Sequence, residues 1–492
     1  MTNDIREDKV RLERLHHLHS IGINPYPSNT ENRMDIKDVL SKPENTAVQI
    51  AGRLIAKREM GKISFSHIKD ATEKIQVAFS EKELGKENYK LFIKYFDLGD
   101  FLHIEGDLFI THKGELTILV KKYTLLSKAL LPLPEKFHGL TDVEIRYRQR
   151  YLDLIANDQS MRIAKTRSLV VREIRNYFDN KGFFEVETPV LQTLYGGALA
   201  KPFTTHHNAL DIPLYLRVAP ELYLKRLIVG GFEKVYEVAK CFRNEGIDNN
   251  HNPEFTQIEF YWAYANYQDL MNLIEDLLPK IITAAGLPLA LKIQDKDVDF
   301  TPPYPRHTMR DIIKQYAHID IEDFPDQTSL FAKIKDLKID GVDKNTGYGK
   351  MIDEIYKTFA RPHIINPVFM IDHPVELSPL AKRKVENQKY VERMQLVCVG
   401  GNELCNGFSE LNDPLDQEAR FRDQERLQQA GDDESMPFDE DFITALKHGM
   451  PPTAGLGMGI DRLIKLLLDT QNLKEVILFP TLKPEKVDPT EE

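Results

Sequence analysis

The chain has 492 residues, of which 42 % are hydrophobic and 29 % charged, and its formal net charge is −11. This composition is typical of folded globular proteins and excludes global disorder, while the length predicts about two to four domains. The negative charge excludes a protein coated in positive potential that holds nucleic acid indiscriminately, although it leaves room for a local basic face.

No apolar run reaches the roughly 18 to 20 residues that a membrane-spanning helix needs, and residues 1–10 are charged rather than signal-like. We therefore expect a cytoplasmic protein that does not bind membranes. The three cysteines, Cys241, Cys398 and Cys405, are too few for a disulfide framework, and none belongs to a Cys-x-x-Cys pair suited to zinc. We expect them to be reduced and to pack in the interior.

Residues 1–45 predict a helical extension, since apolar residues recur among the charges from Ile5 to Leu18 until Gly22 and the Asn24-Pro25-Tyr26-Pro27 stretch end the pattern. Residues 46–130 predict a barrel. Short alternating or β-branched runs lie at residues 48–56, 63–68, 74–79, 101–110 and 116–120, with a helix-compatible segment at 83–95. This order matches the five-stranded Greek-key barrel called the OB-fold.

The Leu131-Pro132-Leu133-Pro134 stretch predicts a stiff linker, which we place at residues 131–150. The remainder, residues 151–492, mixes helices and strands. Helical spacing runs from Ile163 to Phe178, and strand candidates lie at residues 183–191, 234–242, 256–263 and 395–399, before a final helix at 459–468. Residues 285–350 have little assignable pattern, and we treat them as an inserted subdomain.

Three segments of this second part carry the chemistry. Residues 181–189 are a helix end and a strand closed by a proline, which alone is a common arrangement. Residues 241–261 are two apolar strands around a polar loop that contains Arg243, whose planar fork can hold a phosphate oxygen and a carboxylate together. Residues 455–462 place three glycines before a helix with Arg462, so the backbone can approach a ligand. Neither a Walker-type loop nor a dinucleotide fingerprint is visible.

In this order the segments resemble the three motifs of class II aminoacyl-tRNA synthetases, and residues 22–480 resemble the bacterial lysyl-tRNA synthetases. The resemblance implies an α+β fold, with an OB-fold anticodon-binding barrel and a catalytic domain whose antiparallel sheet is flanked by helices. It implies activation of L-lysine with ATP and Mg²⁺, transfer to tRNA(Lys), and a homodimer formed through the first motif.

The resemblance assigns ATP binding to Arg243, Glu245, His251, Phe255, Glu403 and Arg462. Arg243 and Arg462 are also the expected catalytic residues, because the amino-acid carboxylate attacks the α-phosphate and the protein mainly positions charges. The family has a magnesium-binding acid in the strand before Gly400-Gly401. Here Glu403 is retained, Glu410 is a further metal candidate, and the nearest match to the strand acid is Gln395, after one extra residue. An amide oxygen binds Mg²⁺ less strongly than a carboxylate does.

Three carboxylates, Glu221, Glu259 and Glu410, fall in segments that line the family's amino-acid pocket. Buried like charges raise one another's pKa, so we expect that only a doubly cationic guest neutralises them, and lysine has two ammonium groups. We assign Glu410 and Tyr261 to the ε-ammonium, and Glu221 and Glu259 to the α-ammonium. The resemblance adds Gly197, Asn406 and Phe408 to this pocket. An aspartyl or asparaginyl enzyme would need a basic or amide pocket instead.

In the barrel, residues 48–70 contain five basic and two acidic residues, which makes this segment the expected RNA face. Arg58, Phe65 and Gln76 match anticodon-contacting positions of the family, and an aromatic face and an amide suit a splayed single strand. Two alternatives stay open. A paralogue that attaches lysine to a protein lacks the barrel, and a non-catalytic RNA-binding paralogue predicts no lysine-dependent exchange of pyrophosphate into ATP.

Overall fold

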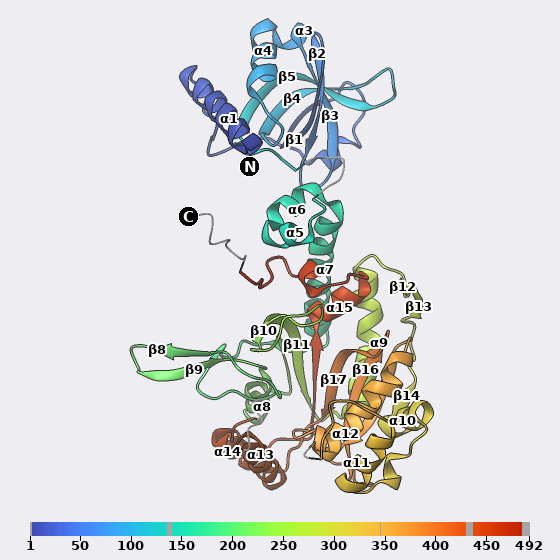
Figure 1. Ribbon diagram of the computed structural model, residues 1–492. Coiled ribbons are helices and arrows are strands. Elements are labelled where there is room, and N and C mark those ends of the chain that lie inside the picture. Colours follow the sequence, from blue (N-terminus) through green and yellow to red (C-terminus); the bar gives the residue numbers. More distant parts are fainter. Residues whose placement is uncertain (1, 135–139, 345, 430–435, 485–492) are drawn as a thin grey trace. The chain divides into compact units, whose positions relative to one another are not determined.

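The computed structural model describes residues 2–134, 140–344, 346–429 and 436–484, and it divides the chain into two compact units, residues 1–141 and 142–492 (Figure 1). The predicted linker, residues 131–150, spans this division, and its residues 135–139 lie outside the described residues. The same holds for residues 485–492, at the end of the predicted catalytic domain.

The first unit contains a closed barrel with the strand order β1-β2-β3-β5-β4, in which only β3 and β5 run parallel. The strands are β1 (Ala47–Met60), β2 (Ile63–Lys69), β3 (Lys74–Ser80), β4 (Phe101–Ile110) and β5 (Leu116–Ser127). The helices are α1 (Thr2–Ser20), α2 (Ile36–Val39), α3 (Glu81–Leu84) and α4 (Lys86–Tyr95). The predicted OB-fold is confirmed.

Helix α4 packs against the barrel through its aromatic face, since the ring of Phe92 stacks on Phe79 with 3.6 Å between the centroids. The predicted helix over residues 83–95 is divided at Gly85, whose φ of +78° is incompatible with a continuous α-helix. Lys57 Nζ donates to the carbonyl oxygens of Phe92, Ile93 and Phe96 at the end of α4. Lys57, which we counted in the basic RNA face, therefore has a structural role.

A buried ion cluster joins the start of β4 to the end of β5. Lys128 Nζ lies 2.6 Å from Asp97 Oδ2 and 2.9 Å from Asp100 Oδ2, and the side chains of Lys128 and Asp100 are both fully buried. Asp100 also accepts hydrogen bonds from the backbone N–H groups of Asp97 and Ala129. Arg14 of α1 completes the cluster by pairing with Asp97.

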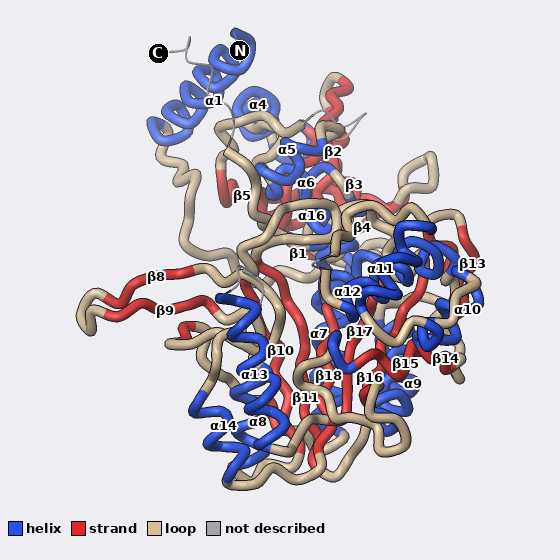
Figure 2. Tube along the Cα trace, turned by 60° about the horizontal axis from the view of Figure 1, so that its bottom comes forward, coloured by secondary structure: helices blue, strands red, loops and turns tan. Residues whose placement is uncertain are grey.

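The second unit is built on an eight-stranded sheet with the order β14-β15-β16-β17-β18-β11-β10-β6 (Figures 1 and 2). Its pairs are antiparallel except at the two edges, where β14 runs parallel to β15 and β6 parallel to β10. The strands are β6 (Phe184–Glu185), β10 (Lys234–Phe242), β11 (Glu254–Ala263), β14 (Arg306–Thr308), β15 (Val368–Pro374), β16 (Tyr390–Cys398), β17 (Asn402–Ser409) and β18 (Thr453–Gly459). The predicted α+β class is confirmed.

Two small sheets accompany the large one. They consist of β7 (Leu191–Gln192), β9 (Ile212–Leu216) and β8 (Thr204–His207), and of β12 (Ala290–Ile293) and β13 (Lys296–Asp299). The β8–β9 hairpin projects away from the large sheet in both views (Figures 1 and 2). All three cysteines are free and buried, as predicted.

The helices of this unit are α5 (Val143–Arg148), α6 (Arg150–Ala156), α7 (Asp158–Asn180), α8 (Glu221–Val229), α9 (Tyr267–Ala284), α10 (Met309–Ala317), α11 (Gln327–Asp336), α12 (Tyr348–Ile355), α13 (Pro414–Gln429), α14 (Glu440–Lys447), α15 (Ile460–Leu467) and α16 (Leu473–Val476). A π-helical turn (Tyr356–Ala360) and 3₁₀ turns (Ile321–Asp323, Arg361–His363 and Val375–Leu377) complete it. Within the described part of the chain, no helix combines the length and apolar character needed to cross a membrane.

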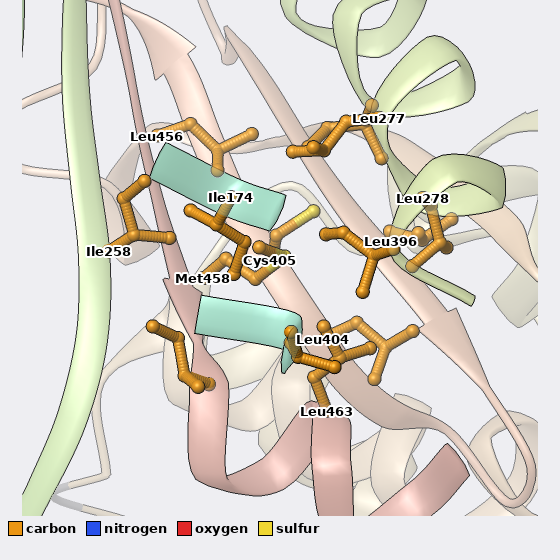
Figure 3. Close-up of a cluster of buried hydrophobic side chains, with 14 of the residues drawn as sticks. Ile174, Ile258, Leu277, Leu278, Leu396, Leu404, Cys405, Leu456, Met458 and Leu463 are labelled. Carbon is orange, nitrogen blue, oxygen red and sulfur yellow. The ribbon is translucent and has the colours of Figure 1, made fainter. Parts of the chain in front are cut away.

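The two faces of the large sheet differ because side chains alternate along each strand. On one face, Ile258 of β11, Leu456 of β18 and Leu396 of β16 are buried against Ile174 of α7 and Leu277 of α9 (Figure 3). This apolar face is the main core of the unit. The opposite face has polar residues at the alternate positions of the same strands, and it carries the candidate site.

The described residues of the predicted insertion at residues 285–350 contribute to two cores, since Ile293, Val298 and Phe300 belong to the main core and the helices that follow form a second one. Its helices α10, α11 and α12 bury apolar residues such as Ile313, Leu330 and Ile352. This core extends beyond residue 350, since Met370 of β15 also belongs to it. The insertion is therefore attached to the edge of the large sheet through β14 and β15.

We expect Lys128→Met to destabilise the first unit by about 3–5 kcal/mol, because it leaves the buried carboxylate of Asp100 without its cation. Lys122→Met is the matched control, since the Lys122 pair with Glu105 is exposed and contributes about 0–1 kcal/mol. Tryptophan fluorescence would not report on the first unit, because the only tryptophan of the sequence, Trp262, lies in the second. The measurement is therefore hydrogen exchange of the β4 and β5 amides in the full chain. Equal protection of these amides in both variants would contradict the prediction.

Candidate active site

The polar face of the large sheet forms the floor of a cavity of about 360 Å³. Cross-strand pairing sets its rows: Glu259 of β11 lies opposite Gly457 of β18, and Gly457 lies opposite Asn406 of β17. The predicted residues that line this cavity are Gly197, Glu221, Arg243, Glu245, His251, Phe255, Glu259, Tyr261, Glu403, Asn406, Phe408 and Arg462. Twelve residues from distant segments thus meet at one surface.

Of the site residues predicted in the second unit, Gln395 and Glu410 do not line this cavity. Gln395 lines an adjoining cavity of about 340 Å³, which shares His251, Glu403 and Arg462 with the first. Glu410 is fully buried behind the floor, next to Gly455. A Cβ atom at Gly455 would lie 2.2 Å from Glu410 Oε1 and 2.3 Å from Tyr261 Cε1. Glycine is therefore required at this position so that the carboxylate and the phenol ring can approach the strand.

Arg243 follows directly after β10, and its backbone N–H donates to the carbonyl oxygen of Pro253 across the loop. Its guanidinium carbon lies 5.0 Å from the centroid of the Phe255 ring, which holds the planar group in place. The Nε atom is buried and has no hydrogen-bond partner among the described residues. Glu245 is exposed, and His251 Nδ1 lies 2.8 Å from Asp248 Oδ2. Arg243 thus has a free donor in a preset orientation.

Arg462 of α15 donates to the backbone oxygen of Glu403 across the cavity. The neighbouring Asp461 is buried, accepts a hydrogen bond from the backbone N–H of Thr256 at 2.8 Å, and pairs with Arg167 of α7. Asp461 therefore ties α15 to the start of β11. Sequence reasoning missed Asp461 and Arg167 as positioning residues, although Asp461 lies directly beside Arg462 in the third motif.

The carboxylates of the predicted lysine pocket already have a cation from the chain. Lys225 Nζ lies 2.5 Å from Glu221 Oε1 and 2.5 Å from Glu410 Oε2, and its side chain is fully buried. The expectation that only a guest neutralises these acids was therefore wrong. Lys225 stands four residues after Glu221 on α8, so helical spacing could have revealed this pair once α8 was recognised.

Burial raises the pKa of Glu221 and Glu410, and Lys225 counteracts this shift. Burial also lowers the pKa of Lys225, but Glu221 and Glu410 outweigh it and keep the ammonium charged. The pKa of Glu259 is raised well above its usual range by burial and by the charge of Glu221, while Arg243 opposes the shift. Glu259 Oε1 accepts a hydrogen bond of 2.6 Å from Gln257. The pocket therefore holds more carboxylates than it has close cations.

Arg393 of β16 is a second basic residue that sequence reasoning missed. Its Nε donates to Asn406 Oδ1 at 2.8 Å, and its Nη1 donates to the Leu377 carbonyl oxygen and to Ser378 Oγ. These bonds occupy the oxygen of Asn406, so its amide N–H₂ is the group left to face a ligand. Nothing in the spacing of the motifs marks Arg393, because it reaches Asn406 only through strand pairing.

Gln395 and Glu403 are neighbours, even though the sequence comparison needed an extra residue between them. The β16–β17 pair has a β-bulge between Leu396 and Val397, where Leu404 of β17 has no partner in the register. Gln395 Nε2 then donates to Glu403 Oε2 at 2.7 Å, and Gln395 Oε1 faces His373 Nε2 at 3.2 Å. Among the described residues, no group of three or more His, Cys, Asp or Glu side chains could hold a metal ion.

The predicted anticodon residues share one outer face of the barrel in the first unit. Arg58 lies opposite Phe65, and His67 lies opposite Gln76, while the intervening residues of β2 point inward. Gln76 donates to Glu115 Oε2 at 2.8 Å, and His67 Nε2 lies 3.3 Å from the other oxygen of that carboxylate. The face thus combines a half-buried ring, an oriented amide and an exposed guanidinium.

Comparison with known proteins agrees with both units. Residues 142–483 match the family of class II tRNA synthetases (D, K and N), and residues 48–126 match the OB-fold nucleic acid binding domain. A lysine–tRNA ligase of Dehalococcoides mccartyi is 48 % identical over 98 % of both chains. That of Carboxydothermus hydrogenoformans is 48 % identical over 97 % of this chain and 98 % of its own. That of Thermotoga maritima is 46 % identical over 98 % and 97 %. The chain therefore belongs to the lysine–tRNA ligases of the class II tRNA synthetase family.

Proposed function

We propose that the chain activates L-lysine with ATP, giving lysyl-adenylate and pyrophosphate, and then transfers lysine to the 3′ end of tRNA(Lys). The observation that carries this proposal is one cavity in which Arg243 faces the carboxylates of Glu221 and Glu259. The arginine suits a phosphate and a substrate carboxylate, and the two acids suit ammonium groups. Supply of charged tRNA to translation would place the protein in the cytoplasm.

In the first step, the lysine carboxylate attacks the α-phosphorus of ATP and pyrophosphate leaves. Arg243 would hold the carboxylate and the α-phosphate together and stabilise the charge that develops on the phosphate oxygens. Adenine would lie between the Phe255 ring and the Arg462 guanidinium, Glu245 would accept from its amino group, and His251 would reach the outer phosphates. In the second step, a ribose hydroxyl of the tRNA attacks the lysyl carbonyl and AMP leaves.

Mg²⁺ fits this site as an ion that arrives with ATP. It usually binds one or two protein carboxylates together with phosphates and water, and it supplies charge that offsets the phosphates. Glu403 lines both cavities and is the carboxylate we assign to it. Gln395 turns its amide N–H₂ toward Glu403, and Glu410 is held by Lys225, so we leave both out of the metal site.

In the amino-acid pocket, we assign Glu410 and Tyr261 to the ε-ammonium of lysine, and Glu221 and Glu259 to its α-ammonium. Support comes from Glu410 Oε1, which is buried and has no hydrogen-bond partner among the described residues. The Gly197 backbone would approach the α-amino end. Its φ is +87°, and a Cβ atom there would lie 2.8 Å from Glu221 Cβ, which requires glycine. Asn406 and Phe408 would complete the walls.

The homodimer is a further part of the proposal. Strand β6 ends the large sheet and carries Phe184, whose side chain is 63 % exposed and whose ring packs edge-on against Phe232. Val190 and Leu191, directly after the first motif, are also exposed. An exposed apolar group at a sheet edge is suited to pairing with a second copy of the chain.

The experiment that tests the function is lysine-dependent exchange of pyrophosphate into ATP, followed by charging of tRNA(Lys). Exchange with lysine and charging of the tRNA are expected. Exchange without any charging of tRNA would favour ligation of lysine to a protein acceptor. No exchange with lysine would favour a non-catalytic RNA-binding protein, and exchange with aspartate or asparagine alone would refute the pocket assignment.

Arg243→Lys is expected to lower kcat/KM for lysine-dependent exchange by about 100-fold to 1000-fold, and Arg243→Ala to nearly abolish it. A lysine keeps the charge but loses the planar fork and the stacking on Phe255. The exchange assay at saturating ATP is the measurement. Arg422→Lys, on the exposed face of α13, is the control and should match the unaltered protein; a similar activity of Arg243→Lys would refute the assigned role.

Phe65→Ala is expected to raise the KM for tRNA(Lys) by about 10-fold to 100-fold, because stacking on one base is lost. Exchange with lysine and ATP should not change, since the barrel takes no part in activation. Phe65→Tyr keeps the ring and should retain charging. An equal loss of exchange and charging in Phe65→Ala would contradict this division of labour between the two units.

Phe184→Glu is expected to convert the dimer into a monomer, because a carboxylate cannot be buried in an apolar interface without a cation. Sedimentation velocity at micromolar concentration is the measurement. Val385→Glu places the same charge on an exposed loop residue and should leave the dimer intact. The dimer proposal fails if the unaltered protein sediments as a monomer, or if Phe184→Glu remains dimeric.

A further inference from the structure

We propose that Lys225 is a specificity-determining positioning residue. Its ammonium group neutralises one carboxylate of the amino-acid pocket, and the two negative charges that remain match an amino acid with two cationic groups. This inference rests on the proposed function and deepens it, since it names the group that sets the charge class of the substrate. Lys225 itself would not touch the substrate. It would act through Glu221 and Glu410.

The geometry makes Lys225 a bridge between two segments that are far apart in the chain. Glu221 lies on α8, Glu410 follows β17, and the Lys225 ammonium is 2.5 Å from one oxygen of each. The rings of Phe408 and Phe442 lie with their centroids 5.5 Å and 5.9 Å from Nζ and shield the ammonium from water. A fully buried ammonium is stable only where carboxylates pair with it, so its place is set by these two acids.

The charges of the pocket balance only when Lys225 is included. Glu221, Glu259 and Glu410 carry three negative charges, and Lys225 offsets one, which leaves two. Arg393 lines the same cavity and also lowers the pKa of Glu221, but burial lowers the pKa of its own guanidinium, and Glu403 and Asp353 oppose that shift more than Glu221 does. We therefore count the charge of Arg393 with Glu403 and Asp353, while Arg243 is assigned to the phosphate and the substrate carboxylate. The two remaining charges match the α-ammonium and ε-ammonium of lysine. A neutral side chain would leave one buried charge unmatched.

Lys225 also leaves specific oxygens for the substrate. It occupies Glu221 Oε1 and Glu410 Oε2, while Glu410 Oε1 faces Gly455 and the Tyr261 ring. Because one oxygen of each carboxylate is held, the other has a defined direction before the substrate arrives. Acceptor oxygens oriented in this way select an amino acid by its charge and by the direction of its ammonium groups. Selection of lysine over other doubly cationic amino acids must come from the length of the cavity.

Removing the ammonium should make lysine binding depend on pH. The charged or titratable groups around Lys225 are Glu221 on its own helix, Glu259 and Tyr261 on β11, Glu410 after β17, and Arg393 on β16. Without Lys225, burial and mutual repulsion raise the pKa of Glu221 and Glu410 further, so a larger fraction of these carboxyl groups is protonated at neutral pH than in the unaltered protein. A protonated carboxyl cannot pair with an ammonium, and ionisation returns as the pH rises through the raised pKa.

Lys225→Met is therefore expected to raise the KM for lysine about 100-fold at pH 7, and this loss should shrink steadily toward pH 9 as the carboxylates ionise. The assay is lysine-dependent pyrophosphate exchange by the full chain, with KM and kcat measured separately. Lys280→Met, an exposed lysine of α9, is the matched control and should behave like the unaltered protein at every pH. A pH-independent loss, or a fall in kcat alone, would overturn the inference.

A double variant supplies the second test. If Lys225 acts through Glu410, the rise in the lysine KM of Lys225→Met/Glu410→Gln should be about as large as that of the more affected single variant, since one charge of each sign is removed. A rise in the double variant equal to the product of the two single rises would overturn the inference. Should Lys225→Met fail to fold, Glu410→Gln alone decides: its inhibition by norleucine, whose side chain is neutral, should strengthen at least about 10-fold relative to lysine binding. An unchanged preference would overturn the inference.

The proposed function and the inference fail in different ways. Absence of lysine-dependent exchange in the unaltered protein would refute the proposed function before any variant is made. Normal exchange in the unaltered protein, together with a Lys225→Met variant whose lysine KM is unchanged, would leave the function standing and refute only the role of Lys225.

Discussion

The alternation of side chains across the strands β11, β16, β17 and β18 is the constraint on which the catalytic unit depends. Residues such as Ile258 and Leu456 bury one face against α7 and α9, and this apolar burial stabilises the sheet. Their neighbours Glu259 and Gly455 must then point to the other face. The same pairing that builds the core thus lines up the site, and a register shift of one residue would destroy both.

Several charged groups on the site face are tolerated because they have partners of opposite charge. Lys225 pairs with Glu221 and Glu410, and Asp461 holds Arg167 and the backbone of β11. Buried charges without partners cost several kcal/mol, so these contacts make the polar face compatible with a stable fold. They also leave a small number of groups unpaired, including Arg243 Nε and Glu410 Oε1, and those are the groups we assign to the substrates.

The barrel unit is also stabilised by an apolar core and by buried ion pairs. Its inward residues form a closed apolar core, and the ion cluster of Lys128, Asp97 and Asp100 fastens the strands β4 and β5 beside it. Its outer face is then free to carry Arg58, Phe65 and Gln76. We therefore assign activation chemistry and recognition of a single-stranded anticodon to separate units, each of which has its own core and its own functional surface.

The sequence by itself determined the OB-fold, the α+β class and the segments that contribute to the site, because strand periodicity and motif residues are local properties of the chain. The tertiary structure decided which polar groups meet: the Lys225 pair with Glu410, the Arg393 bond to Asn406 and the Gln395 bond to Glu403 join segments that no local pattern connects. Ion pairs depend on distances between segments far apart in sequence, and those distances exist only after the strands have paired.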